Sequence, residues 1–298
     1  MLLSRKNKRF AFFLPMVVWL LVFLLYPTLD LIRLSFKDIG FVTEGTSGYT
    51  FENYTQLFQH SDFYTILRVT IIFVFFSVLF QMFLGFVLAR VMVAGEDRGL
   101  VGTVVVRTSV LIGWVIPGVV VGIIWNLFLT ESTTGILNYW LNAWGIGRLP
   151  FLSDPTWALI SVTVANIWRG TAASMIMQYA GLKVLPNELH EAAVIDGASF
   201  IQETLYVTIP AMKPVLYTNL VLITIKTVNT FDSIIALTGG GPGRSTEVLA
   251  LSAYLRVFRQ FDLGSGAAIA VILFVINLVM TLIYSRIIDF EEEKGRAA

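Results

Sequence analysis

Charged and polar side chains inside long apolar stretches are the residues of this sequence with the clearest chemical potential. Lys226 stands in the stretch from Pro214 to Leu237, and an ionised lysine at the centre of a bilayer costs about 2.5–3.5 kcal/mol. If the stretch is one helix with about 100° between residues, its polar residues share one stripe: Lys226, Asn229, Thr230 and Ser233. Asp232 lies to one side of that stripe, so a pair with Lys226 inside the helix is poorly placed. The stripe indicates a cavity, a binding surface or hydrogen bonding between helices.

Two further stretches carry similar features. The stretch 157–182 places polar and small residues on one face: Asn166, Arg169, Gly170 and Ala173. In the stretch 104–128, Trp114 lies one turn before the helix break expected at Pro117. Trp114 is a candidate stacking surface and an equally good packing residue. Gly118 and Gly122 form a small-xxx-small pair that lets another helix approach closely, so packing is the favoured role of Gly118.

No pattern in the sequence fits a catalytic, cofactor-binding or metal site. The glycine-rich stretch 238–246 fails as a phosphate-binding loop, because Arg244 stands where the loop requires lysine and no strand is expected before it. The same arginine replaces the last glycine of the dinucleotide fingerprint. His60 and His190 are not at metal-binding spacing, and the chain has no cysteine for thiol chemistry. We therefore expect no bound cofactor and no enzyme activity in this chain.

Composition predicts an all-α protein embedded in a membrane. Of its 298 residues, 56% are hydrophobic and only 14% are charged, which is too apolar for a soluble domain and fits several membrane spans. The net charge of +1 argues against a nucleic-acid partner. Membrane lipid is the expected surrounding.

Six apolar segments are long enough to cross a bilayer, for which about 20 residues are needed. They lie near residues 10–34, 66–93, 104–128, 157–182, 214–237 and 263–288. The first is read as an uncleaved span, because no small-residue cleavage site follows it. Lys and Arg gather at the N-terminus, at the turn between spans two and three, and at the C-terminus, which predicts that both termini are cytoplasmic. The third outer loop, with Arg244, Arg256 and Arg259, departs from this pattern.

The polar segment from Glu191 to Pro210 separates the fourth and fifth apolar stretches. Its first residues, Glu191-Ala192-Ala193, favour helix, and Gly197 can adopt the left-handed conformation that ends one. Pro210 precedes the next membrane helix, where a missing N–H is tolerated. A short amphipathic helix-turn-helix with few basic residues needs a protein partner more than a lipid one.

The spacing of this segment, E-A-A, three residues, Gly197, nine residues and then V-T-I-P, resembles the cytoplasmic coupling loop of ABC importer permeases. The resemblance implies a single permease domain over 1–298, with the coupling loop at 183–213. It implies contact with the ATPase through Glu191, Ala192, Ala193, Asp196, Gly197 and Pro210. It also implies a bacterial or archaeal plasma membrane, a second permease, two ATP-binding subunits that use the ATP, and an extracytoplasmic solute-binding protein.

Three other stretches are similar to the maltose-type permease subunit: Asn166–Gly170, Phe151–Pro155 and the run from Asn229 to Pro242. In that family a sugar binds at mid-membrane. The resemblance places Trp114, Gly118, Asn166, Arg169, Gly170, Thr227 and Thr230 at sugar-contacting positions, and the polar stripe adds Lys226 and Asn229. The implied function is ATP-driven import of a sugar, oligosaccharide or polyol phosphate.

Two departures from that family leave the solute open. Arg169 stands where the maltose type has an apolar residue, and Lys226 has no counterpart there. Two cations would favour an anionic solute, such as a glycerol phosphate or a uronic-acid oligosaccharide, over a neutral maltodextrin. A self-contained channel or secondary carrier would also explain both cations, and an intramembrane enzyme is a third class. The polar segment from Glu191 to Pro210 distinguishes the importer from the channel, because a channel does not require such a coupling loop.

Overall fold

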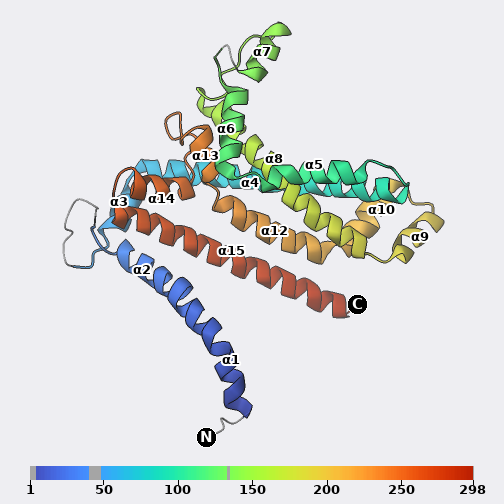
Figure 1. Cartoon of the computed structure of the whole chain (residues 1–298), viewed down its shortest axis with the longest axis horizontal. Coiled ribbons are helices and arrows are strands. Elements are labelled where there is room, and N and C mark those ends of the chain that lie inside the picture. Colours follow the sequence, from blue (N-terminus) through green and yellow to red (C-terminus); the bar gives the residue numbers. More distant parts are fainter. Residues whose placement is uncertain (1–4, 40–47, 133–134, 298) are drawn as a thin grey trace. The chain divides into compact units, whose positions relative to one another are not determined.

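The computed structural model describes residues 5–39, 48–132 and 135–297, with side chains from Phe13 to Arg286 within those ranges. Every regular element in this part of the chain is a helix (Figure 1), which confirms the all-α prediction. Residues 40–47 of the first predicted outer loop lie outside the description. The same is true of the side chains of Arg5, Lys6, Lys8, Arg9, Lys294 and Arg296, which contribute to the predicted orientation.

The helices have the following bounds. The N-terminal ones are α1 (Arg5–Leu20), a π-helical stretch (Leu21–Leu25), α2 (Tyr26–Ser35), α3 (Glu52–Gln59) and α4 (Ser61–Asp97). Next come α5 (Thr103–Val115), α6 (Gly118–Leu129), α7 (Ile136–Ala143), α8 (Pro155–Val184), α9 (Asn187–Ile195) and α10 (Phe200–Glu203). A second π-helical stretch (Thr204–Thr208) precedes α11 (Ile209–Ala211), α12 (Lys213–Val228), α13 (Asp232–Leu237), α14 (Leu249–Phe258) and α15 (Leu263–Ala297).

The chain divides into two compact units. The first comprises Met1–Phe63 and Ser252–Val275, and the second comprises Tyr64–Leu251 and Ile276–Ala298. In the first unit, the buried side chain of Asn53 donates hydrogen bonds to the carbonyl oxygens of Ser35 and Lys37, at 3.0 and 2.9 Å. These bonds satisfy backbone groups that α2 leaves open at its end.

Length and composition identify fewer spans than the six expected. Within the described residues, three helical segments are long and apolar enough to cross a bilayer: Phe13–Ser35, Ser61–Asp97 and Leu263–Arg286. Two pairs of helices are sharply bent: Thr103–Val115 with Gly118–Leu129, and Phe200–Ala211 with Lys213–Val228. Counting each pair as one span raises the number to five. Helix α8 covers the predicted fourth span without a break, but it is not among these candidates. The count of six and the cytoplasmic termini stay predictions.

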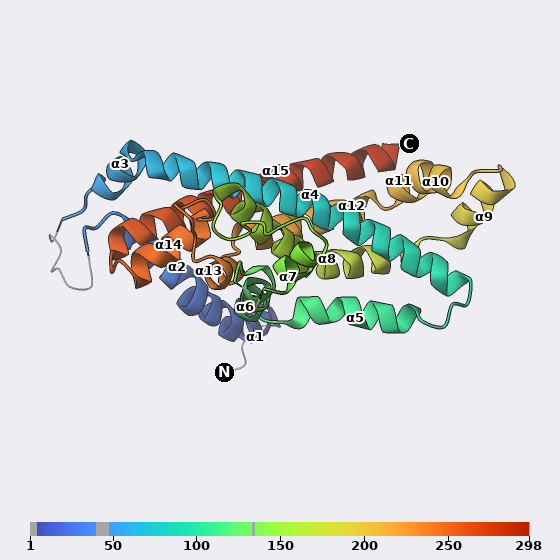
Figure 2. The same cartoon turned by 90° about the horizontal axis from the view of Figure 1, so that it is seen from above.

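In the second unit, α4, α5 and α8 run side by side (Figures 1 and 2). The apolar core of this bundle contains Ala89 of α4, Met175 of α8 and Met212 next to α12, none more than 1% exposed. Polar groups also join the helices. Asn219 of α12 donates to the buried Ser174 hydroxyl of α8 at 2.8 Å. Such bonds are favoured between membrane helices, where water is absent.

Two helix breaks shape this unit. The first lies at Ile116 and Pro117, as expected from the proline, and α5 and α6 meet there at 101°. The second lies at residues 229–231, between α12 and α13. The prediction of one continuous helix from 214 to 237 is therefore wrong, and so is the single stripe that joined Lys226 to Ser233. No proline or glycine marks this second break.

The helix-turn-helix predicted for the polar segment is confirmed. Helix α9 ends at Ile195, and Gly197 follows with a φ of +74°, a value that favours glycine. Ser199 and Gln202 then form a capping box that starts α10. Past Pro210, the chain bends by 74° into α12.

Candidate functional site

The two helix breaks meet at Gly118 and Asp232. Gly118 begins α6, and a side chain there would collide with the Asp232 carboxylate at the start of α13. One turn later, a side chain at Gly122 would collide with the Ser233 carbonyl oxygen. A further turn along, Asn126 donates a hydrogen bond to the Leu237 carbonyl oxygen at 2.7 Å. The predicted small-xxx-small pair is thus confirmed as a packing surface, and α6 and α13 lie side by side in Figure 1.

Asp232 forms an ion pair with Arg169 of α8. Arg169 Nη1 lies 3.3 and 3.4 Å from the two Asp232 oxygens, which is long for a charge-assisted hydrogen bond. The Ser233 amide also donates to this carboxylate, at 2.9 Å. Asp232 was not among the predicted site residues. The sequence did show a carboxylate within an apolar stretch, a position that usually requires a partner. That partner lies on another helix.

Lys226 lies over the ring of Trp114, with its ammonium nitrogen 5.6 Å from a ring centroid. This is a cation–π distance. Lys226 is exposed and Trp114 is 46% exposed. Trp114 and Lys226 stand just before the two helix breaks that meet at Gly118 and Asp232. Within the described residues, no ion-pair partner of Lys226 is present.

Four predicted contact residues lie buried instead of joining this exposed cluster: Asn166, Gly170, Thr227 and Thr230. Gln81 of α4 packs against Gly170 and donates to the Asn166 carbonyl oxygen at 3.2 Å. The Thr230 hydroxyl bonds the Lys226 carbonyl oxygen at 3.0 Å. These residues support the helices that carry the cluster, and their contact with a solute stays a prediction.

Asn229 pairs with Asn277 of α15. Each side-chain amide donates to the other, at 3.1 and 3.4 Å; Asn229 is exposed and Asn277 is half-buried. Asn277 was not among the predicted site residues. Its signal was an isolated amide near the middle of the apolar segment Leu263–Arg286, a position where polar groups usually have a partner or face water.

The coupling segment, residues 187–211, is attached to α4 by a buried ion pair. Arg90 Nη2 lies 2.6 Å from Glu203 Oε1, and the two side chains are only 11% and 8% exposed. His190 Nδ1 lies 3.0 Å from the same oxygen, and the Arg90 guanidinium stacks on the Phe200 ring at 4.6 Å. Glu203 was not among the predicted coupling residues. On an amphipathic helix beside an expected partner surface, nothing in the sequence indicates that the Glu203 carboxylate is buried.

The other predicted coupling residues lie around this ion pair. Ala193 is buried, whereas the remaining ones are exposed: Glu191, Ala192, Asp196, Gly197 and Pro210. The segment also exposes apolar side chains, with Ile195 at 84%, Ile201 at 68% and Val194 at 59%. Exposed apolar residues gathered on one short segment are typical of a protein interface.

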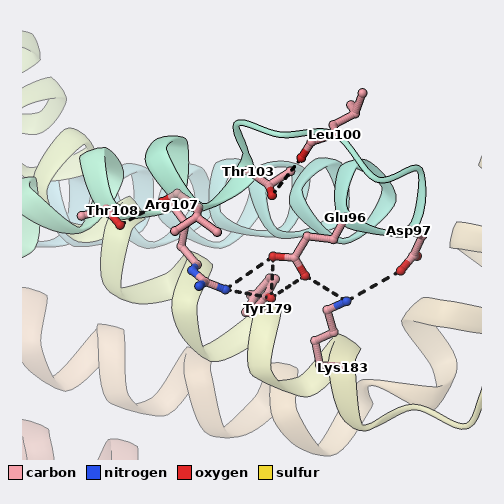
Figure 3. A network of polar contacts seen from close by, with 9 residues as sticks. Glu96, Asp97, Leu100, Thr103, Arg107, Thr108, Tyr179 and Lys183 are labelled. Atoms are coloured by element: carbon pink, nitrogen blue, oxygen red, sulfur yellow. Dashed lines mark hydrogen bonds and ion pairs between the residues drawn. The ribbon is translucent and has the colours of Figure 1, made fainter.

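A second polar network lies nearby and ties α4, α5 and α8 together (Figure 3). The Tyr179 hydroxyl lies 2.7–2.8 Å from both oxygens of Glu96. Lys183 reaches Glu96 at 3.0 Å, and Arg107 donates to the Tyr179 oxygen at 2.9 Å. Each of the three helices therefore contributes at least one charged or hydroxyl group.

Glu131, after α6, fixes the entry to α8. Its carboxylate accepts bonds from the Leu152 amide, the Ser153 amide and the Ser153 hydroxyl, at 2.8–3.0 Å. Burial raises the pKa of the Glu131 carboxyl, but these bonds from Ser153 and Leu152 outweigh it, so that the pKa lies below its ordinary value. Asp154 then caps α8.

Comparison with known proteins gives a consistent result. The family model described as "Binding-protein-dependent transport system inner membrane component" matches residues 81–289, which is more than half of the chain. Among curated proteins, the trehalose/maltose transport system permease protein MalF of Thermococcus litoralis is 32% identical over 94% of this chain and 93% of its own length. The sulfoquinovosyl glycerol transport system permease protein SmoG of Agrobacterium fabrum is 31% identical over 92% of this chain and 88% of its own.

A solved structure agrees with these relatives. One chain of a bacterial ABC transporter involved in import of the acidic polysaccharide alginate superposes with a TM-score of 0.82, at 25% identity, over 96% of both chains. Family, relatives and fold therefore point the same way. The chain belongs to the binding-protein-dependent transport system inner membrane component family, as a permease subunit of a carbohydrate ABC importer.

Proposed function

We propose that the meeting point of the two broken helices is the solute site of this permease. The observation that carries the proposal is the contact of Gly118 with Asp232, which places two helix breaks beside the charges of Arg169 and Lys226. Transporters commonly bind solutes where membrane helices are interrupted, because the freed backbone groups and helix ends face the solute. An exposed lysine within an apolar stretch also needs a water-filled cavity or a partner.

The site residues divide into two groups in this proposal. Trp114, Lys226 and Asn229 are exposed and offer a ring face, a cation and an amide to a polar solute. The remaining predicted contacts set the position of those side chains or become accessible in another conformation of the permease: Gly118, Asn166, Arg169, Gly170, Thr227 and Thr230.

The coupling segment is the proposed contact with the ATP-hydrolysing subunits. Its exposed apolar residues, Val194, Ile195 and Ile201, supply a docking surface. The ion pair between Arg90 and Glu203 would pass a displacement of the segment to α4. ATP then biases the permease between conformations, and the chain itself holds no nucleotide.

The proposed assembly contains this chain, a second permease, two ATP-binding subunits and an extracytoplasmic binding protein, in a bacterial or archaeal plasma membrane. Solved complexes of the alginate transporter include its periplasmic binding protein, which supports that composition. The proposed solute is a sugar, oligosaccharide or polyol phosphate. The relatives named above handle both neutral sugars and acidic ones, so similarity alone supports no finer class.

A matched pair of substitutions tests the docking surface. Ile195→Asp places a charge on the coupling segment, and Ile146→Asp places one after α7, at a residue 61% exposed. The tagged chain carrying Ile195→Asp should lose the ATPase during gentle purification and should lose uptake, whereas Ile146→Asp should keep both. Retained ATPase and uptake with Ile195→Asp would contradict the proposed docking surface.

A second substitution tests the importer against the channel. Proline cannot adopt the positive φ of Gly197, so Gly197→Pro should abolish uptake while the protein remains in the membrane. Continued uptake by this variant would favour the self-contained channel or carrier.

A further inference from the structure

We propose that the solute site selects an anionic solute, one that carries a carboxylate, phosphate or similar group, and that Asp232 occupies the place of that anion when the site is empty. This inference rests on the proposed function of the site. It goes further by naming the charge of the solute and the protein group with which the solute competes.

The cluster carries more positive than negative charge. Arg169 and Lys226 are cations, and Asp232 is the carboxylate that pairs with Arg169. Asp232 pairs with Arg169, so the cluster keeps one cation without an ion-pair partner within the described residues, that of Lys226. An unpaired ammonium inside an apolar layer is unfavourable, and an anionic ligand would remove that cost. A neutral sugar would leave it in place.

The two cations are held in different ways. Lys226 is exposed, and Trp114 holds it by one ring face, an interaction that a carboxylate or phosphate can replace. Arg169 is fixed more deeply, with its side chain 16% exposed. Its Nε atom is buried and has no hydrogen-bond partner, so the guanidinium has spare donor capacity.

The ion pair between Arg169 and Asp232 is long and partly exposed. The Arg169–Asp232 distances of 3.3 and 3.4 Å exceed the 2.6 Å of Arg90–Glu203 in the same unit. The longer pair is the weaker one, and 35% of the Asp232 side chain is exposed. An incoming anion bound first by Lys226 would then compete with Asp232 for Arg169. Release of Asp232 would loosen its contact with Gly118 and so link solute binding to the meeting of α6 and α13.

Equilibrium binding to the purified assembly, in nanodiscs and without the binding protein, tests this proposal. The probes are two matched pairs: a four-unit oligouronate against maltotetraose, and sn-glycerol 3-phosphate against glycerol. The variants are Lys226→Gln, the charge-retaining Lys226→Arg, and Lys213→Gln as a control cation at the start of the same helix.

We expect one anionic probe to bind at least about tenfold more tightly than its neutral match. Loss of a hydrogen-bonded charge typically costs a factor of about ten to a hundred. Lys226→Gln should weaken anion binding by that factor, Lys226→Arg should largely restore it, and Lys213→Gln should leave it unchanged. The identity of the tighter anion distinguishes a carboxylate from a phosphate solute. Asp232→Asn should tighten anion binding, because it removes the internal competitor.

Several results would overturn the proposal. These are equal binding of the neutral match, absence of binding by both anions, and anion binding that Lys226→Gln leaves intact. Failure of the assembly with Lys226→Gln but not with Lys226→Arg would also overturn the proposal, because the charge of Lys226 would then serve assembly and not the solute. ATP-driven uptake is measured separately, so loss of uptake with intact anion binding would count against the proposed function and not against the anion.

Discussion

The solute site and the coupling segment are held together in opposite ways. At the site, Arg169 and Asp232 make one long ion pair and Lys226 rests on an aromatic ring. At the coupling segment, the Glu203 carboxylate is almost fully buried and bonded at 2.6 Å to Arg90. Buried pairs of good geometry are costly to break, whereas exposed and longer ones exchange readily. The difference indicates that the coupling end moves as a rigid body and that the site rearranges.

The largest effect should follow from breaking the buried pair. Arg90→Met leaves the Glu203 carboxylate buried without its partner, and such a change typically costs about 3–5 kcal/mol. We expect a clear fall in melting temperature and loss of uptake, measured on the purified assembly and in cells. Arg98→Met, at an exposed arginine just after α4, is the matched control and should change neither.

The exchanged pair Arg90→Glu with Glu203→Arg sharpens this test. If the ion pair itself transmits motion, the exchanged pair should recover part of the uptake that either single variant loses. Full uptake in Arg90→Met alone would show that the pair is not needed for coupling.

Gly118→Ala should have the next largest effect. The new methyl group would collide with the Asp232 carboxylate, and overpacking of this kind costs about 1–3 kcal/mol. Uptake should fall together with melting temperature. Gly102→Ala is the matched control, because nothing lies near its added methyl group. Equal behaviour of the two variants would mean that α6 and α13 do not need their close contact.

Tyr179→Phe probes the network of Figure 3. It removes the hydroxyl that bonds Glu96 and Arg107, and a bond to a charged group is worth about 1.5–3 kcal/mol at full burial and less at this partly exposed position. We expect lower thermal stability with uptake reduced in proportion. Tyr139→Phe, on α7 at a residue 66% exposed, serves as the control. A change in solute preference with unchanged stability would contradict the conclusion that this network belongs to the rigid coupling end of the molecule.

Asn277→Ala should have the smallest effect on stability. Hydrogen bonds between membrane helices contribute about 0.6 kcal/mol on average, and the Asn229–Asn277 pair is partly exposed. Because Asn229, the partner of Asn277, follows Lys226 by three residues, we expect altered uptake with nearly unchanged melting temperature. Ser285→Ala, on the same helix, is the comparison. A large loss of stability in Asn277→Ala would place the site among the rigid parts of the molecule.

The sequence predicted best where one residue determines the local backbone. Gly197 ended α9 and Pro117 separated α5 from α6, as expected. The break at residues 229–231 carries neither residue type, so a periodic pattern continued through it and gave a false stripe. Its cause lies in packing, since α13 must lie flat against Gly118 and Gly122.

The ion pairs between residues on different helices could not be predicted from the sequence, for a different reason. Asp232 and Arg169 are 63 residues apart, and Arg90 and Glu203 are 113 apart. Periodicity within one helix gives no information about such partners. It did locate the charged residues that needed one, because an ionised group in an apolar stretch is rarely left alone.

The most direct test of the account compares movement in the two regions. Since the chain has no cysteine, spin labels can be attached at chosen pairs: Val91 with Leu205 at the coupling end, and Val119 with Leu222 at the site. All four side chains are at least 47% exposed. Distances are measured by pulsed electron resonance with and without trapped ATP. We predict that the site distance changes while the coupling distance stays the same. A fixed site distance, or separation of α4 from the coupling segment, would contradict the account.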